Sequence, residues 1–591
     1  MPESLLESGS EFDRTKVLLA RWLRENAEST RVLTRDELSA LGTDRRFAAG
    51  WRVDIETASG VQPFRVLIDE RFPYSPIRVA SNTADHYLRH PHVEPGGLLC
   101  LPRRPAPTAG IEQAIVTALS DALALVGEWE DPVVVKAEFQ REFVSYWNRG
   151  KDKGATPIRS LLDATNKHTR RIAVWFGDGY TLAGETSQQL LSWLKNRGRS
   201  QESKVVPGAF IYLDEPPVLP FPQRPGELFA MLQQHAHSAA ALLAQLPAQG
   251  DLVLVAQAPS PSGDGLIGMT ISTPKNFDGF RKSNRLRPQA KFALWKMKSD
   301  LGRTSIDRFD SAWIHGRGLN RDQRRLEAST ALILGCGSLG SQVAHRLAQS
   351  GVGRLVLADP EQLSAANVGR HALGIDSVNM NKAAALAGTL RLHFPHLQQT
   401  DDHPISWQSL YDQNPEIFER ASVIVSCLGE WSADGQLGEW HARQSGAPPV
   451  VYGWLDEFGT ASHAIVLSGT GPALGCVLGP DGTLRTPETL WNRDGLVQAE
   501  PACGTLFQPY GPIDAGLAEA LVSRLCLDVL TGKAKVPCHR VHAGSTSQLM
   551  EAGGQWSADH LKYRPTGFEG PFGYERPLDV CGRCQSCQNP R

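Results

Sequence analysis

The sequence is short of several features that would place the chain in a specialised class. Ten cysteines among 591 residues are too few for a disulfide-stapled secreted protein. No apolar run approaches the roughly 20 residues of a membrane helix. The net charge of −2 lacks the basic excess of a protein that coats nucleic acid, and residues 1–14 hold no signal-peptide core. We therefore expect a cytoplasmic protein with no membrane or direct nucleic-acid partner, whose cysteines are thiols, metal ligands or nucleophiles.

The length predicts several domains, because about 600 residues exceed what one hydrophobic core holds. Residues 1–150 predict an α+β domain with helices at 16–24, 113–126 and 136–147 and strands at 51–55 and 64–68. Residues 160–305 predict an α/β linker domain with strands at 171–176, 209–213 and 252–255 and helices at 187–194 and 226–246. Residues 306–591 alternate strands and helices, which predicts a doubly wound, Rossmann-like parallel sheet. We expect a multidomain α/β protein.

A glycine loop lies at the start of this last region. Gly335, Gly337 and Gly340 follow a short apolar strand at 331–334 and precede a helix at 339–349. Glycines at these positions let phosphates approach backbone N–H groups at a helix N-terminus. Asp359 closes the next strand, where an acid holds a ribose hydroxyl in nucleotide-binding folds. This pattern alone fits an NAD-dependent dehydrogenase about as well as an ATP-binding enzyme.

The residues after this loop favour ATP. Asn367, Arg370 and Lys382 follow Asp359 in an order and spacing that resembles the ThiF/MoeB/E1 superfamily of adenylating enzymes over residues 330–540. The resemblance implies that Arg370 and Lys382 neutralise ATP phosphates, that Asn367 positions them and that Asp359 holds the ribose. Cations suit this chemistry because negative charge grows when a carboxylate attacks the α-phosphate. Solvated surface charges are the alternative reading of Arg370 and Lys382.

The family's magnesium ligand is displaced in this sequence. The family carries an Asp after the next strand, whereas here Glu430 lies one residue beyond that place. The resemblance implies ATP and Mg²⁺ as cofactors, and Glu430 either replaces the Asp or the metal binds differently. An arginine contributed across a dimer is not identified, although four arginines lie near enough in sequence to be considered: Arg308, Arg317, Arg321 and Arg324.

A cysteine nucleophile is predicted late in the chain. Cys503 lies in a loop before a helix predicted at 513–530, the position of the thioester cysteine in the superfamily members that pass the acyl group onward. A glycine-containing loop suits a thiol that meets an adenylate and then a second thiol. An unreactive loop cysteine is one alternative for Cys503, and Cys538 after the helix is a competing nucleophile.

The N-terminal region supplies another thiol. Tyr74-Ser75-Pro76, His90-Pro91-His92 and Cys100-Leu101 together resemble the ubiquitin-conjugating (E2, or UBC) fold over about residues 45–130. His90 precedes Cys100 by ten residues, as in that family, and Cys100 is implied to carry an acyl group as a thioester. His92 stands where the family has Asn, and its charge depends on pH. A buried, inert Cys100 is the alternative.

Four cysteines resemble a structural zinc site. Cys581, Cys584 and Cys587 have the spacing of the second half of the Cys₄ site in the MoeB/ThiF group, and Cys476 is the single upstream partner. Four thiolates leave no open coordination position, so Zn²⁺ there is expected to be structural. A metal-free tail is the alternative.

The order of these domains resembles the bacterial E1–E2 fusions associated with CD-NTases in CBASS anti-phage systems. The resemblance implies a homodimer, a linker domain related to an inactive adenylation domain, and a protein modifier with a flexible C-terminus, either a CD-NTase or a ubiquitin-like protein. The expected route is adenylation, a thioester on Cys503, a second on Cys100 and an amide on a target lysine. Two alternatives stay open: activation of a sulfur-carrier protein, and a catalytically inactive scaffold.

Overall fold

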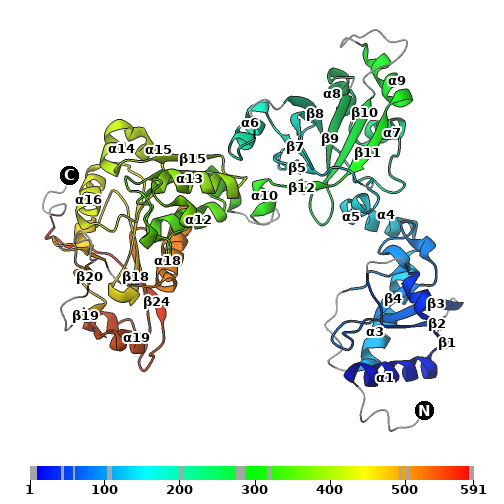
Figure 1. Ribbon diagram of the computed structural model, residues 1–591, viewed down its shortest axis with the longest axis horizontal. Coiled ribbons are helices and arrows are strands. Elements are labelled where there is room, and N and C mark those ends of the chain that lie inside the picture. The colour runs from blue at the N-terminus through cyan, green and yellow to red at the C-terminus, as the bar shows by residue number, and fades with distance from the viewer. Residues whose placement is uncertain are drawn as a thin grey trace.

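The structure is a computed structural model. It describes residues 10–591 except 42–44, 58–59, 103–109, 153, 200–203, 249, 274–285, 316–321, 492–495, 497, 500–505, 508, 585–586 and 588–591. Three main sheets follow one another along the chain (Figure 1), and the N-terminal and C-terminal regions lie on either side of the middle one. The predicted multidomain α/β fold class is confirmed. Within the described residues, no helix combines the length and apolarity that crossing a bilayer requires.

The N-terminal sheet is a four-stranded antiparallel meander in the order β1-β2-β3-β4. The predicted strands are the central pair, which buries Val53, Phe64 and Val66 in the core of the domain. Helices α1 and α3 pack against each other and against the sheet, and Leu19, Leu23, Ile115 and Leu119 enter its core. The elements are α1 (Glu11–Asn26), β1 (Ser29–Val32), α2 (Arg35–Ser39), β2 (Ala49–Thr57), β3 (Gly60–Ile68), β4 (Arg78–Ser81), η2 (Ala84–His86), η3 (Pro95–Gly97) and α3 (Ile111–Glu128).

The helix predicted over residues 136–147 is two helices, α4 (Pro132–Arg141) and α5 (Phe143–Arg149). Glu142 joins them with φ −113° and ψ 23°, which is outside the helical range. Helix α5 buries Phe143 and Trp147 in the core of the middle domain, and the Trp147 Nε1–H points at two carbonyls there, Gly268 O at 3.2 Å and Thr304 O at 3.3 Å. Helix α5 therefore packs in the core of the middle domain, although it follows the N-terminal sheet in the chain.

The middle domain is built on one eight-stranded mixed sheet in the order β11-β10-β9-β8-β6-β7-β5-β12. The helix predicted over 226–246 is also two helices, because the chain leaves the helical conformation at Ala236 (φ −154°). The elements are β5 (Ile158–Ser160), β6 (Arg170–Phe176), β7 (Thr181–Gly184), α6 (Ser187–Lys195), β8 (Val205–Tyr212), α7 (Pro225–His235), α8 (Ala239–Gln245), β9 (Gly250–Ala258), β10 (Gly265–Thr273), α9 (Pro288–Lys298), β11 (Asp300–Thr304) and β12 (Ile306–Arg308).

The C-terminal region contains the predicted parallel sheet, with strands in the order β15-β14-β13-β16-β17-β18-β22-β24. The first five are mutually parallel and the last three are added antiparallel. The strands are β13 (Thr330–Leu334), β14 (Arg354–Ala358), β15 (Gln399–His403), β16 (Val423–Ser426), β17 (Val450–Leu455), β18 (Ala461–Leu467), β22 (Cys538–Ala543) and β24 (Phe572–Arg576), and short pairs form from β19 (Thr489–Trp491) with β23 (Gly554–Trp556) and from β20 (Gln498–Ala499) with β21 (Leu506–Phe507).

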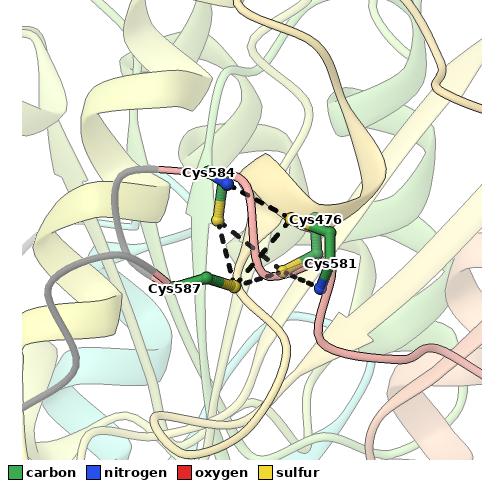
Figure 2. A group of neighbouring side chains, drawn as sticks. All are labelled: Cys476, Cys581, Cys584 and Cys587. Carbon is green, nitrogen blue, oxygen red and sulfur yellow. Dashed lines mark hydrogen bonds between the residues drawn. The ribbon is translucent and has the colours of Figure 1, made fainter.

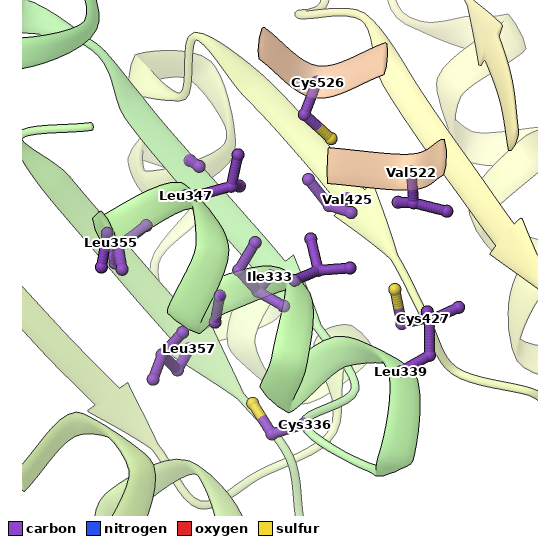
Figure 3. Close-up of a cluster of buried hydrophobic side chains, with 14 of the residues drawn as sticks. Ile333, Cys336, Leu339, Leu347, Leu355, Leu357, Val425, Cys427, Val522 and Cys526 are labelled. Atoms are coloured by element: carbon purple, nitrogen blue, oxygen red, sulfur yellow. The ribbon is translucent and has the colours of Figure 1, made fainter. Parts of the chain in front are cut away.

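Helices cover this sheet and place its loops. Their bounds are α10 (Ser311–Ile314), α11 (Gln323–Ala328), α12 (Ser338–Gln349), α13 (Lys382–His393), α14 (Trp407–Gln413), α15 (Pro415–Arg420), α16 (Trp431–Arg443), α17 (Leu474–Val477), α18 (Pro512–Leu530), α19 (Thr546–Glu551) and α20 (Ala558–Leu561), with 3-10 turns η4 (Ala365–Asn367), η5 (Ile375–Ser377) and η6 (Glu457–Gly459). The α12 and α18 side chains interlock over β13 and β16 (Figure 3). Cys336, Cys427 and Cys526 are buried in this core, so they are packing residues.

Candidate functional site

The glycine loop lies where β13 ends, and two of its glycines are sterically required. Gly335 has φ 85°, and a Cβ there would lie 2.6 Å from the Cys427 carbonyl oxygen. A Cβ at Gly340 would lie 1.8 Å from the Gly335 carbonyl oxygen. Gly337 differs, since no described atom lies within 4 Å of a Cβ built there. The loop is therefore tight on its inner side and open at Gly337.

Helix α12 begins directly after the open glycine. In the part of the chain that the structure describes, no side chain caps its N-terminus at Gly337. The first N–H groups of a helix have no partner within the helix and favour an anion. The open turn and the uncapped helix therefore fit a nucleotide phosphate, on the geometry of this chain alone.

Asp359 organises the loop from the neighbouring strand. Its carboxylate is buried and accepts backbone N–H groups from Cys336 at 2.7 Å and Glu361 at 2.8 Å. Burial raises the pKa of Asp359, and those two hydrogen bonds oppose the shift. The residue therefore fixes the loop's shape, and its predicted contact with a ribose hydroxyl stays a prediction.

Lys382 is buried as the first residue of α13, and its Nζ pairs with the Glu361 carboxylate. Asn381 caps that helix with its side-chain oxygen and donates its amide to the Asp359 carbonyl at 2.8 Å. A buried ammonium needs a partner, and an exposed carboxylate such as Glu361 is displaceable by a more highly charged anion. The surroundings of Lys382 therefore differ from those of a solvated surface lysine.

Arg370 and Asn367 lie on the segment between β14 and α13. The Arg370 guanidinium lies 4.6 Å from the Tyr510 ring centre and donates to the Tyr510 carbonyl at 3.2 Å. The Ser338 hydroxyl, in the glycine loop, is 3.4 Å from the Arg370 carbonyl. Asn367 accepts hydrogen bonds from Ser364 and caps the turn η4. Arg370 thus links the glycine loop with the start of α18.

A carboxylate that the sequence reasoning missed lies one turn beyond Glu430. Asp434, in the first turn of α16, hydrogen bonds to the Ser426 hydroxyl at the end of β16, the strand beside β13. Burial raises the pKa of Asp434 to about 6, and the charge of Glu430 adds to the shift. Glu430 itself is exposed and accepts the Ser432 hydroxyl. Only the helical spacing of i and i+4 in the sequence pairs these two acids.

Cys503 lies outside the described residues, but both flanks of its segment are anchored. Upstream, Glu488 is buried and pairs with Arg576 at 2.6 Å and His560 at 2.9 Å. Downstream, Tyr510 contacts Arg370. Cys538, the competing nucleophile, is buried in β22, and burial raises the pKa of its thiol to about 11. These properties disfavour Cys538 as a reactive thiol.

The structure describes two of the four arginines that were considered for a contribution across a dimer. Arg308 pairs with Asp310 at 2.8 Å. Arg324 is exposed and lines a cavity of about 1180 Å³ between the middle domain and the sheet of β13. Arg317 and Arg321 lie outside the described residues.

Cys100 is exposed at the end of a tight loop in the N-terminal domain. Its N–H donates to the His92 carbonyl at 2.8 Å, and Leu98 and Leu99 before it are buried. Gly97 turns the loop with φ 80°, where a Cβ would lie 2.7 Å from the Thr83 carbonyl oxygen. The backbone therefore holds an accessible thiol on a buried support, so Cys100 is not a buried cysteine, and its acyl-carrier role stays a prediction.

The two histidines before Cys100 have different surroundings. His90 stacks on Trp129 with ring centres 4.4 Å apart, and burial lowers its pKa. His92 has φ 59°, is partly exposed and faces the carboxylates of Glu138 and Glu142. His90 is thus a packing residue, whereas His92 is polar and near solvent.

The sequence motif gave no sign of the residues that α4 and α5 bring to this loop. Tyr146 accepts the His92 N–H at 2.8 Å, and Arg149 donates to the Val93 carbonyl at 3.1 Å. Glu138 and Glu142 lie 46 and 50 positions after His92 in the chain. Only the tertiary fold brings such distant residues together.

The four predicted zinc ligands lie together (Figure 2). The sulfurs of Cys476, Cys581, Cys584 and Cys587 all lie within 4.8 Å of one another. Four sulfurs around one zinc ion, with Zn–S bonds of about 2.3 Å, are separated by roughly 3.8 Å. Pairs here are separated by 3.3 to 3.9 Å, for example Cys476–Cys587 and Cys581–Cys587. Backbone N–H groups of Arg583 and Cys584 lower the pKa of Cys581 against the effect of burial, whereas burial raises the pKa of Cys476 and of Cys584. It is the spacing of the four sulfurs that fits a bound cation.

Comparison with known proteins agrees with this architecture. Residues 315–507 match the ThiF family, and residues 30–155 match prokaryotic E2 family B. The chain is 30% identical over 184 residues to the ATP-dependent ubiquitin transferase-like protein Cap2 of Enterobacter hormaechei subsp. hoffmannii, covering 29% of this chain and 28% of that protein. It is 24% identical over 233 residues to the protein of the same name from Pseudomonas aeruginosa, covering 39% and 41%.

The chain therefore aligns with less than half the length of each of these relatives. Among solved structures, the E. coli MccB complex with MccA-N7isoASN has a TM-score of 0.32 at 15% identity, covering 45% of this chain and 69% of that one. The two family matches coincide with the glycine-loop domain and the Cys100 domain. This chain joins a prokaryotic E2 family B domain to a ThiF family domain, the domain pair of an E1–E2 fusion.

Proposed function

We propose that the chain is an ATP-dependent conjugating enzyme that activates the C-terminal carboxylate of a protein modifier and transfers it to an amine. The observation that carries this proposal is the accessible Cys100 thiol, held in an E2-like domain on the same chain as an open glycine loop flanked by Lys382 and Arg370. One of these sites suits adenylation and the other suits acyl carriage.

In the proposed route, the glycine loop and the α12 N-terminus bind the ATP phosphates, and Lys382 and Arg370 neutralise charge as the carboxylate attacks. Asn367 and Asp359 complete the nucleotide contacts, and Glu430 with Asp434, both near the start of α16, are the carboxylates that we propose to hold Mg²⁺. ATP supplies the free energy that a thioester retains. The acyl group passes to Cys503, then to Cys100, and ends in an amide with a target lysine.

The identity of the modifier is also a proposal. The similarity to ATP-dependent ubiquitin transferase-like proteins supports conjugation to a protein modifier. From the order of the domains we propose a CD-NTase as modifier, in anti-phage defence, and a ubiquitin-like protein is the alternative. A homodimer, a cytoplasmic location and a structural Zn²⁺ on the four-cysteine cluster belong to the same proposal. The cluster ties the C-terminal tail to α17, so zinc chelation is expected to lower thermal stability, and Cys584→Ser is expected to remove that response.

A conjugation assay tests the route. The full chain, ATP and a candidate modifier are expected to give a thiol-sensitive adduct and then a thiol-resistant amide. Cys503→Ala is expected to abolish both, whereas Cys100→Ala stops the amide and leaves a thioester on Cys503. Lys382→Ala is expected to abolish adenylate-dependent pyrophosphate exchange. Conjugation that persists in both cysteine variants contradicts the route, and a thiocarboxylate product favours activation of a sulfur carrier.

A further inference from the structure

His92 lies between two carboxylates beside the exposed thiol. Its Nε2 is 3.1 Å from Glu138 Oε2, and its Nδ1 is 3.7 Å from Glu142 Oε2. The Glu138 side chain is 13% exposed and the Glu142 side chain is 42% exposed. The first contact is a hydrogen bond to a fixed acid, and the second is a longer approach to an acid that faces solvent.

The Glu138 contact determines where the imidazole carries its proton. A carboxylate only accepts hydrogen bonds, so the neutral ring carries its proton on Nε2 and keeps a lone pair on Nδ1. Arg141 holds the other oxygen of Glu138 at 3.0 Å, which fixes that carboxylate. The His92 N–H to Tyr146 fixes the backbone of the histidine. Nδ1 is thus an oriented proton acceptor supported by a third group, the arrangement of a catalytic base.

The same charges act on Cys100. The pKa of its thiol is raised by burial first and then by the charges of Glu94 and Glu142, while Arg149 and Arg45 oppose this. The charge of Glu142 thus acts on the thiol, and the same carboxylate lies 3.7 Å from His92 Nδ1. Among the described residues, the charged and titratable groups that act on His92 or Cys100 from the surrounding elements include Arg45, Arg78, Glu94, Glu138, Arg141, Glu142, Tyr146 and Arg149.

We propose that His92 is the general base for acyl transfer from Cys100, and that Glu142 binds the ammonium group of the acceptor lysine. His92 Nδ1 takes one proton from the ammonium, and the freed nitrogen lone pair attacks the thioester carbonyl carbon. The C–N bond forms, the C–S bond breaks, and the electron pair leaves on the Cys100 sulfur as a thiolate. The nitrogen loses its second proton to the Cys100 thiolate, and the imidazolium returns its proton to water. This inference rests on the acyl-carrier role of Cys100 proposed above.

The test loads Cys100 without adenylation. The full chain is incubated with a glycine-terminated peptide thioester of a small thiol, which exchanges onto Cys100, and occupancy is read by peptide mass spectrometry with Cys100→Ala as the blank. Discharge is then followed with Nα-acetyl-lysine amide, whose side-chain amine is free, and with hydroxylamine. Hydroxylamine is already unprotonated at neutral pH and needs no base.

We expect His92→Gln to slow discharge to the lysine amide about 100-fold at neutral pH, with a smaller loss at high pH where the amine is free. Hydroxylamine discharge is expected to change only a few-fold. Glu138→Gln is expected to give part of the same pattern, and Glu142→Gln to raise the lysine-amide concentration needed for half-maximal rate. Glu128→Gln, an exposed carboxylate at the end of α3, is the matched control with no expected effect.

Equal slowing of both nucleophiles in His92→Gln would overturn the base assignment, because it would reflect a lost loop support or a lost oxyanion donor. An unchanged lysine rate overturns it as well. If the peptide does not exchange onto Cys100, the acyl-carrier role and this inference both fail. If exchange works but ATP-dependent loading does not, only the adenylation route fails.

Discussion

At the scale of single residues, Asp434 has a raised pKa that the sequence motifs do not predict. Its carboxyl is half-buried beside Ser426, and burial followed by the charge of Glu430 raises its pKa to about 6. In the unfolded chain the same group titrates near its ordinary value of about 4. The folded state therefore holds this proton more tightly than the unfolded state.

The sign of the resulting pH effect follows from that difference. Between pH 4 and pH 6 the folded protein binds more protons, so this group lowers the free energy of unfolding as pH rises through that window. Asp434→Asn keeps an acceptor for Ser426 and removes the titration. We expect this variant to be more stable than the parent by about 1–2 kcal/mol at pH 8 and equal to it near pH 4. Melting curves at the two pH values measure this difference, and a gain of equal size at both contradicts the assignment.

The motif spacing predicted Cys100, Lys382 and the four-cysteine cluster because each depends on residues a short distance apart or on a repeated residue type. The partners of His92 could not be predicted in the same way. Glu138 and Glu142 are ordinary surface acids in sequence, and they reach His92 only because α4 and α5 separate at Glu142. The substitution of His for the family's Asn was visible, but its carboxylate partners were not.

At the scale of elements, helix α5 connects the middle domain with the Cys100 loop. Its apolar face is part of the middle-domain core through Phe143 and Trp147. Its polar side chains, Tyr146 and Arg149, hold the backbone of the Cys100 loop at His92 and Val93. Period-3.6 patterning predicted helix here, but it could not indicate that the apolar face belongs to a different domain.

Trp147→Ala tests this coupling. Removing a fully buried indole costs about 3–5 kcal/mol. The cavity lies in the middle domain, yet we expect faster hydrogen exchange at His92 and Cys100 and slower discharge of a Cys100 thioester. Hydrogen-exchange mass spectrometry of the full chain measures the first effect. Val133→Ala on α4, where the valine is 76% exposed, is the control, and protection of the Cys100 loop that is unchanged in Trp147→Ala would show that α5 does not support it.

At the scale of the whole molecule, the two proposed reaction sites lie far apart along the chain's path. Figure 1 shows the ThiF-family sheet and the E2-like sheet on either side of the middle domain. The Arg197 guanidinium donates to the Leu392 carbonyl at 3.0 Å across the junction, and the cavity of about 1180 Å³ lies beside it. A junction with polar lining and open space favours relative motion of domains or transfer between chains.

Mixing two inactive variants separates those routes. Lys382→Ala lacks the cation proposed for adenylation, and Cys100→Ala lacks the proposed acyl carrier. If the proposed homodimer brings the E1 part of one chain near the E2-like domain of the other, we expect the mixture to recover conjugation that neither variant shows alone, with a rate that depends on protein concentration. Gel analysis of the amide product measures it. No recovery at any concentration would place the whole transfer within one chain.

Because α5 contacts both the middle domain and the Cys100 loop, it also limits the recombination of domains between this protein and its relatives. A recombination joint near residue 150 would separate the thiol-bearing loop from the surface on which Trp147 rests. An N-terminal domain moved into another protein without strands β10 and β11 would therefore expose the Trp147 indole to solvent. Its Cys100 loop would also lose support. We therefore expect the N-terminal domain and the middle domain to be inherited together.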